Sequence, residues 1–146
     1  MKKKLFPIML GLILVSGFTF ANNENVTPVV LNNFTTSFNH ATNVNWEKTG
    51  NFYKATFWMD GKELYAIFSK EGHKVAIARN ILSTELPDQL HASLNNNFPK
   101  YWITDLFEYN SHGETRYYVT IENSEDTQIL ESIGTIEWSL FKKTTK

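Results

Sequence analysis

The residues best suited to acid–base chemistry or metal binding in this sequence are its four histidines. They are His40, His73, His91 and His112. No two of them have the spacing of metal ligands, and none belongs to an H-E-x-x-H motif. The chain also contains no cysteine that could bind a soft metal. We therefore expect no metal site and no cofactor.

The sequence also lacks the common patterns of catalytic sites. It has no G-x-S-x-G nucleophile elbow, and its seven glycines do not form a phosphate-binding loop. An enzyme would need His91, Asp105 or Glu108 to converge in a buried pocket. We keep this as a third functional hypothesis, but the sequence predicts a protein that is not an enzyme.

Large aromatic residues on both faces of a predicted strand point instead to binding. Residues 52–59 read FYKATFWM, and successive side chains of a strand point to opposite faces. If the odd-numbered residues of 53–59 and 117–121 face a core, their even-numbered neighbours face outward. Aromatic residues mixed with arginine are enriched at protein interfaces. The candidate binding residues on the outward face are Phe52, Lys54, Trp58, Arg116 and Tyr118.

A second interpretation of the outward aromatics remains open. Trp58 and Tyr118 could pair with neighbours across the strands, which is ordinary stabilisation of a sheet. Trp46 is different, because its spacing from Phe38 and its alternation with Val44 favour a place in the core.

Two similar units, 27–80 and 85–142, would position these residues. Each begins with a helix that has a proline in its first turn, at Thr27-Pro28 with Thr27 as the cap, and near Leu86-Pro87. Each helix also has one apolar stripe at helical spacing. The stripes are Val30, Phe34, Phe38 and Ala41 in the first helix, and Leu86, Leu90, Leu94 and Phe98 in the second.

Alternating patterns predict four strands after each helix. The sequence YKATF at 53–57 matches YYVTI at 117–121, third strands follow at 64–69 and 127–131, and final strands at 74–79 and 135–141. Short connections make neighbouring strands antiparallel. We therefore expect an α+β fold, a tandem repeat of a helix plus a four-stranded antiparallel sheet. Both helices would cover one face and leave the other, concave face open.

The first 21 residues have the pattern of a cleaved export signal. Three lysines precede an apolar run, and a cleavage signal with small residues, Thr19-Phe20-Ala21, follows it. An uncleaved N-terminal anchor is the alternative. Residues 22–146 would then form a single domain of formal charge −4, since removing Lys2, Lys3 and Lys4 lowers the charge from −1. We expect a periplasmic or secreted protein, with no nucleic-acid partner and no stable membrane insertion after cleavage.

Several short motifs, in this order and spacing, resemble a known family. They are the Phe38 to Trp46-Glu47 spacing, Tyr53-x-Ala55-x-Phe57, Leu86-Pro87 and Phe98-Pro99. They resemble the beta-lactamase-inhibitor-like, PepSY-like proteins exported by Bacteroidetes, from about residue 29 to 141. The second unit departs from the pattern, because Leu106 or Phe107 takes the place of Trp46. The resemblance implies the tandem fold and a PepSY-like domain without known catalytic activity.

The leading functional hypothesis is an exported module that binds a protein or peptide through the helix-free face. The partner could be a secreted enzyme that the module restrains. The alternative is a small-ligand carrier or sensor with a pocket lined by aromatic residues. The sequence identifies no partner, and we expect a monomer.

Overall fold

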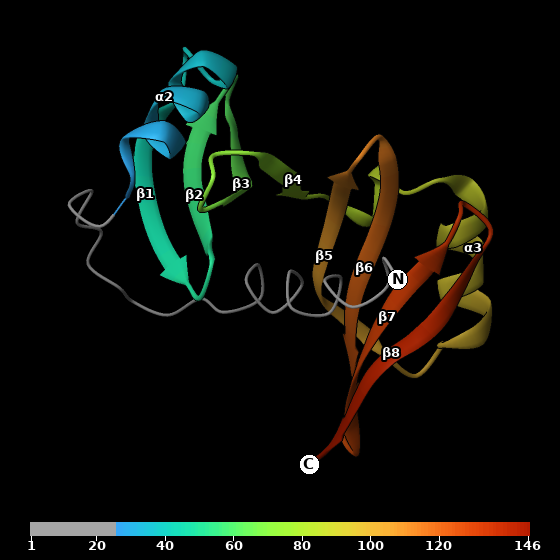
Figure 1. Ribbon diagram of the computed structural model, residues 1–146. Coiled ribbons are helices and arrows are strands. Elements are labelled where there is room, and N and C mark those ends of the chain that lie inside the picture. The colour runs from blue at the N-terminus through green and yellow to red at the C-terminus, as the bar shows by residue number, and fades with distance from the viewer. Residues whose placement is uncertain (1–25) are drawn as a thin grey trace. The chain divides into compact units, whose positions relative to one another are not determined.

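The computed structural model of the chain describes residues 26–146, so the predicted export signal lies outside the described residues (Figure 1). These residues form an α+β fold with two α-helices and an open antiparallel sheet of eight strands. The strands follow one another in sheet order from β1 to β8. The chain divides into two compact units, the first ending at Ala78 and the second running from Arg79 to Lys146.

The first unit begins with helix α2 (Pro28–Ser37). Strands β1 (Thr42–Thr49), β2 (Phe52–Met59) and β3 (Lys62–Ser69) follow, and β4 (Lys74–Asn80) runs across the boundary between the units. The predicted first position of α2 is confirmed, but the predicted Thr27 side-chain cap is wrong. The backbone of Thr27 is extended, as at an N-cap, yet its hydroxyl makes no capping hydrogen bond. The helix therefore begins on Pro28, whose fixed φ suits the first turn.

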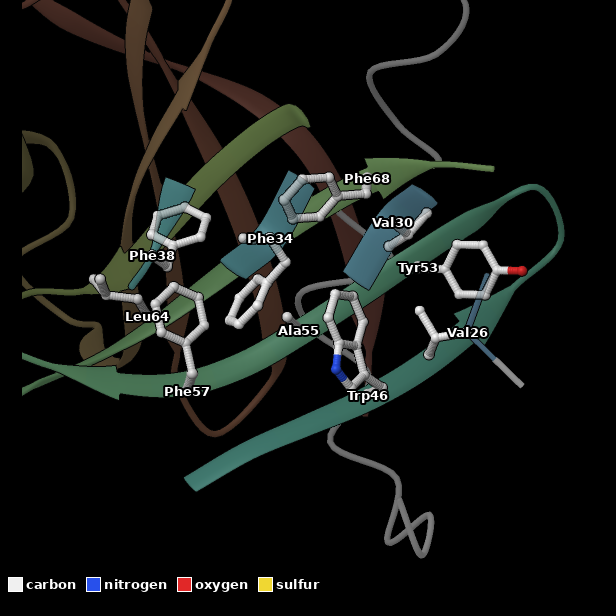
Figure 2. Packing of buried hydrophobic residues seen from close by; sticks show 11 residues of the cluster. Val26, Val30, Phe34, Phe38, Trp46, Tyr53, Ala55, Phe57, Leu64 and Phe68 are labelled. Carbon is white, nitrogen blue, oxygen red and sulfur yellow. The ribbon is translucent and has the colours of Figure 1, made fainter. Parts of the chain in front are cut away.

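Helix α2 lies over β1, β2 and β3, and an aromatic core fills the space between them (Figures 1 and 2). The centroid of the Phe34 ring lies 5.1 Å from that of the Trp46 ring and 5.0 Å from that of the Phe57 ring. Both contacts are edge-to-face. This geometry is the one that aromatic quadrupoles favour. The predicted core place of Trp46 is confirmed. Buried in the same cluster are Val26, Val30, Phe34, Phe38, Trp46, Tyr53, Ala55, Phe57, Leu64, Ala66 and Phe68.

The second unit has the same order of elements. A short 3₁₀ turn η2 (Ser83–Glu85) precedes helix α3 (Asp88–Asn97), and the strands are β5 (Trp102–Ser111), β6 (Glu114–Glu122), β7 (Asp126–Ile133) and β8 (Glu137–Thr145). The predicted last strand, 135–141, is displaced toward the C-terminus. Lys142 and Lys143 continue β8 by pairing with Ile129 and Gln128. Lysines are common in edge strands, where their charged ends reach water.

The core of the second unit is mainly aliphatic. Leu90 and Leu94 of α3 are buried against β-strand residues, and the Trp138 indole N–H donates a hydrogen bond to the Leu90 carbonyl at 3.0 Å. The predicted apolar stripe packs in this core, but Leu86 precedes α3 and Phe98 is its C-cap. The predicted proline in the first turn of this helix is wrong, because Pro87 is the N-cap residue. Buried in this cluster are Ile81, Leu86, Leu90, Leu94, Leu106, Tyr117, Val119, Ile121 and Leu130.

The first strand after each helix has an irregularity in the same place. The register shifts between Thr42 and Asn45 in β1, and between Ile103 and Asp105 in β5. Trp46 then pairs with Ala55, and Leu106 pairs with Val119. Leu106 rather than Phe107 therefore occupies the core position that corresponds to Trp46.

Candidate binding site

Trp58 is the predicted site residue that the structure leaves most open. It lies on β2, on the face opposite the aromatic core, and 45% of it is exposed. Thr42 of β1 and Glu63 of β3 are its register partners. In the described part of the chain its indole has no ring contact or hydrogen bond. The predicted outward direction of Trp58 is thus confirmed.

The prediction that Lys54 faces solvent is wrong, whereas Phe52 is partly exposed at the start of β2. Only 3% of Lys54 is exposed. Its ammonium lies 2.7 Å from the Glu47 carboxylate, which is its register partner on β1, and 5.9 Å from the centre of the Tyr65 ring. The Glu47 carboxylate and the Tyr65 ring replace the water that the ammonium group loses on burial. The aliphatic part of the Lys54 side chain can therefore pack along the sheet.

The predicted exposure of Tyr118 is also wrong, since only 2% of it remains accessible. Its ring packs edge-to-face against Tyr109 and Phe141, and its hydroxyl donates a 2.8 Å hydrogen bond to Glu131. Burial, followed by the bond to Glu131, raises the pKa of Tyr118. The alternative of cross-strand pairing therefore holds for Tyr118, and the helix-free face of this unit is partly an interior surface.

Arg116 lies next to Tyr118 on the same face and shares its carboxylate. The Arg116 guanidinium lies 2.6 Å from Glu131 and 3.5 Å from Glu114. The hydrogen bond to Glu131 raises the pKa of Arg116. The structure thus brings two predicted residues, Arg116 and Tyr118, together through Glu131. Sequence patterns missed Glu131, although the register that pairs it with Tyr118 follows from the β6–β7 hairpin.

An open cleft of about 450 Å³ surrounds Arg116. At its edge the β7–β8 turn holds Ile133 and Ile136, both more than half exposed. The cleft thus places charged groups next to exposed apolar groups, a mixture typical of protein-binding surfaces. Its lining residues are Glu114, Thr115, Arg116, Glu131, Ser132, Ile133, Gly134 and Ser139.

Residues proposed for an enzymatic site lie in different settings. Asp105 lines a second cleft, whereas Glu108 accepts hydrogen bonds from Arg79 at 3.0 and 3.3 Å. Within residues 26–146, no group of three or more His, Cys, Asp or Glu residues could hold a metal ion. None of the helices described is both long and apolar enough to span a bilayer.

Comparison with solved structures places this architecture among proteins of Bacteroides. The chain is similar to a protein of Bacteroides eggerthii provisionally described as periplasmic, with a TM-score of 0.72, 11% identity, and coverage of 87% of this chain and 90% of that one. A DUF2874 family protein of Bacteroides ovatus gives a TM-score of 0.70, 15% identity, and coverage of 81% and 86%. A BLIP-like protein of Bacteroides fragilis gives a TM-score of 0.67 and 16% identity, and the match covers 88% of this chain and 89% of that one.

These similarities show a shared fold, since the sequences are less than one fifth identical. The fold is that of BLIP-like and DUF2874 family proteins of Bacteroides, which agrees with the inhibitor-like part of the predicted resemblance. No protein-family model matches the sequence, and no curated protein matches it.

Proposed function

We propose that this chain is an exported, non-enzymatic module that binds a protein or peptide through its helix-free sheet surface. Trp58 would be the central anchor in the first unit, and the Arg116 cleft a further contact in the second. The location is the periplasm or the medium. The predicted export signal and the fold shared with a Bacteroides eggerthii protein described provisionally as periplasmic support this location.

The observation that carries the proposal is the half-exposed Trp58 side chain on β2, a strand that is paired on both sides. A large aromatic residue on a solvated strand gains nothing from the core, and smaller polar residues normally occupy such positions. Tryptophan is also among the residues most enriched at the energetic centres of protein interfaces. Next to it, Tyr65 and Glu63 form a 2.9 Å hydrogen bond that gives the surface a polar border.

The finer features of the sequence interpretation belong to the same proposal. The two units would be copies of one ancestral helix-plus-four-strand unit, supported by their matching register shifts. The domain would be PepSY-like, with the helices on one side, and the partner an exported enzyme that binding restrains. The BLIP-like neighbour makes an enzyme a reasonable class of partner to test, although similarity of fold does not transfer function.

Selection from a displayed library of random peptides tests the proposal. We expect peptides that bind the wild-type protein and lose about tenfold or more in affinity with Trp58→Ala, the loss typical of an interface anchor. Val29→Ala is the matched control, because Val29 is similarly exposed on helix α2. Peptides that bind Trp58→Ala as tightly as wild type would count against this surface.

The alternative, a small-ligand carrier or sensor, is favoured by cleft size alone. The Arg116 cleft, at about 450 Å³, falls within the volumes of small-molecule sites. A thermal-shift screen of metabolites and glycans separates the two functions. A ligand that stabilises the wild-type protein at micromolar concentration, and Trp58→Ala equally, would favour the carrier.

A further inference from the structure

A second cleft in the second unit, of about 430 Å³, is lined by aliphatic residues, neutral polar residues and one charged residue. Residues 80–83 lie against residues 103–106, and the Ile81 N–H donates a hydrogen bond to the Leu106 carbonyl at 3.0 Å. Leu82 is 70% exposed and Ile103 is 41% exposed. Two large aliphatic side chains thus remain in water beside a hollow, although each would gain from being covered.

Asp105 is the charged residue in this lining, and it is half-buried. Its carboxylate accepts a 3.0 Å hydrogen bond from the backbone N–H of Leu106. In the part of the chain that the structure describes, no lysine, arginine or histidine pairs with it. Burial raises the pKa of Asp105, because the charged form loses water without gaining a cation. A cationic group placed in the cleft would supply the missing partner.

The exposed position of Leu82 is held by a network of charged residues. The Leu82 N–H donates a 2.9 Å hydrogen bond to Glu85, and Glu85 lies 2.8 Å from the Arg79 guanidinium. Arg79 also lies 3.0 Å from Glu108 on β5. The segment that carries Leu82 is therefore attached to β5 at several points. A backbone segment that is already held in place loses less entropy on binding than a mobile one, which favours a binding role.

The first unit provides an internal comparison for Asp105. Asn45 follows the register shift in β1 and pairs with Thr56, just as Asp105 follows the shift in β5 and pairs with Thr120. The position therefore accepts a neutral amide without loss of the strand. The negative charge is a property of the second unit, and Asp105→Asn is a mild way to remove it.

We propose that the Leu82–Asp105 cleft binds a lysine or arginine side chain of a protein or peptide partner. Its cationic group pairs with the Asp105 carboxylate, and apolar neighbours in the partner pack on Leu82 and Ile103. The cleft lies in the second unit and includes no residue of the Trp58 surface. Either site can therefore fail its test while the other stands.

The test uses ¹⁵N-labelled full-length protein and the acetylated, amidated tripeptide Leu-Lys-Leu, whose charge lies on the lysine. We expect saturable changes in the amide resonances of residues 80–83 and 103–106. Asp105→Asn should weaken binding roughly tenfold, as should replacing the lysine by uncharged norleucine, because either change removes a charge-assisted hydrogen bond. Leu82→Ala, a change at an exposed side chain, should weaken binding about threefold or more.

Trp58→Ala should bind the tripeptide like the wild-type protein, which separates this site from the Trp58 surface. Absence of saturable changes at these residues would overturn the proposal, as would equal binding of the norleucine peptide or equal binding by Asp105→Asn. n-Butylamine that binds as tightly as the tripeptide would indicate a small-ammonium site and overturn the assignment to a peptide. A dispersed spectrum of each variant confirms that lost binding does not come from unfolding.

Discussion

The Asn33 side-chain amide donates a 2.9 Å hydrogen bond to the backbone carbonyl of Gly72. This contact ties helix α2 to the turn between β3 and β4, two segments 39 residues apart in the sequence. Gly72 has a positive φ of 90°, and a Cβ at this position would lie 2.7 Å from Asn33 Nδ2 and 2.9 Å from Val29 Cγ2. Glycine thus allows the helix to approach the turn this closely.

Gly72→Ala should lower the free energy of unfolding by about 2–4 kcal/mol, because it adds a steric clash to the strain of a positive φ. Urea denaturation measures the change. Gly61→Ala is the matched control, since Gly61 also has a positive φ but no atom within 4 Å of the added Cβ. Gly61→Ala should lower the free energy of unfolding by only about 1–2 kcal/mol, from the strain of the positive φ alone. Equal costs for both variants would show that the helix yields to the added methyl group.

Tyr118→Phe should reveal the value of the buried hydrogen bond to Glu131. The variant keeps the ring contacts with Tyr109 and Phe141 but loses the hydroxyl, so we expect a loss of about 1–2 kcal/mol in unfolding free energy. Tyr65→Phe removes a comparable 2.9 Å hydrogen bond, which the Tyr65 hydroxyl donates to the exposed Glu63 carboxylate. This variant should lower the free energy of unfolding by less than about 0.5 kcal/mol. If Tyr118→Phe leaves the free energy of unfolding unchanged, the ion pair with Arg116 is sufficient to stabilise the Glu131 carboxylate.

The Asp126 carboxylate should make stability depend on acid pH. Lys143, whose ammonium lies 2.8 Å away, is the main cause of the lowered pKa of Asp126, and bonds from Gln128 and Tyr101 lower it further. A carboxyl pKa that is lower in the folded state stabilises the fold above its unfolded value, about 3.9. This stabilisation is lost as the pH falls through the folded pKa.

Lys143→Gln tests whether the ion pair with Asp126 stabilises the protein at neutral pH and not in acid. The wild-type protein should melt at a higher temperature than Lys143→Gln at pH 6, and the difference should shrink as the pH falls below about 4. Thermal melts followed by circular dichroism between pH 2 and 7 measure it. Lys142→Gln is the control, because no ion pair of Lys142 is found among residues 26–146. A difference that stays constant across this pH range would contradict the assigned role of Asp126.

The elements and the cores could be predicted because their periodicities are strong. The helical stripe through Val30 and Phe34, and the alternation through Tyr53 and Phe57, identify core residues without knowledge of any contact. The capping role of Thr27 could not be settled in this way. A threonine before a proline is compatible with a cap, but the rotamer that would form the bond depends on the folded surroundings.

The binding surface was less predictable, because alternation assigns a face to a residue but does not reveal what covers that face. Lys54 and Tyr118 have the predicted direction, yet they are buried by partners on other strands, Glu47 and Glu131 among them. The sequence offers Asp105 as a candidate residue of an enzymatic site, not as a binding residue. Its isolation from cations depends on the side chains around it, which single-sequence patterns do not specify.

Each unit holds one indole at the contact between its helix and its sheet. Trp46 touches Phe34 of α2, and Trp138 donates its hydrogen bond to α3. Trp58 and Trp102, by contrast, are exposed and can be replaced. With those two changed to phenylalanine, proteins that retain only Trp46 or only Trp138 would report by fluorescence on one half of the molecule at a time. The chain thus contains its own optical probes for asking whether its halves unfold together or in sequence.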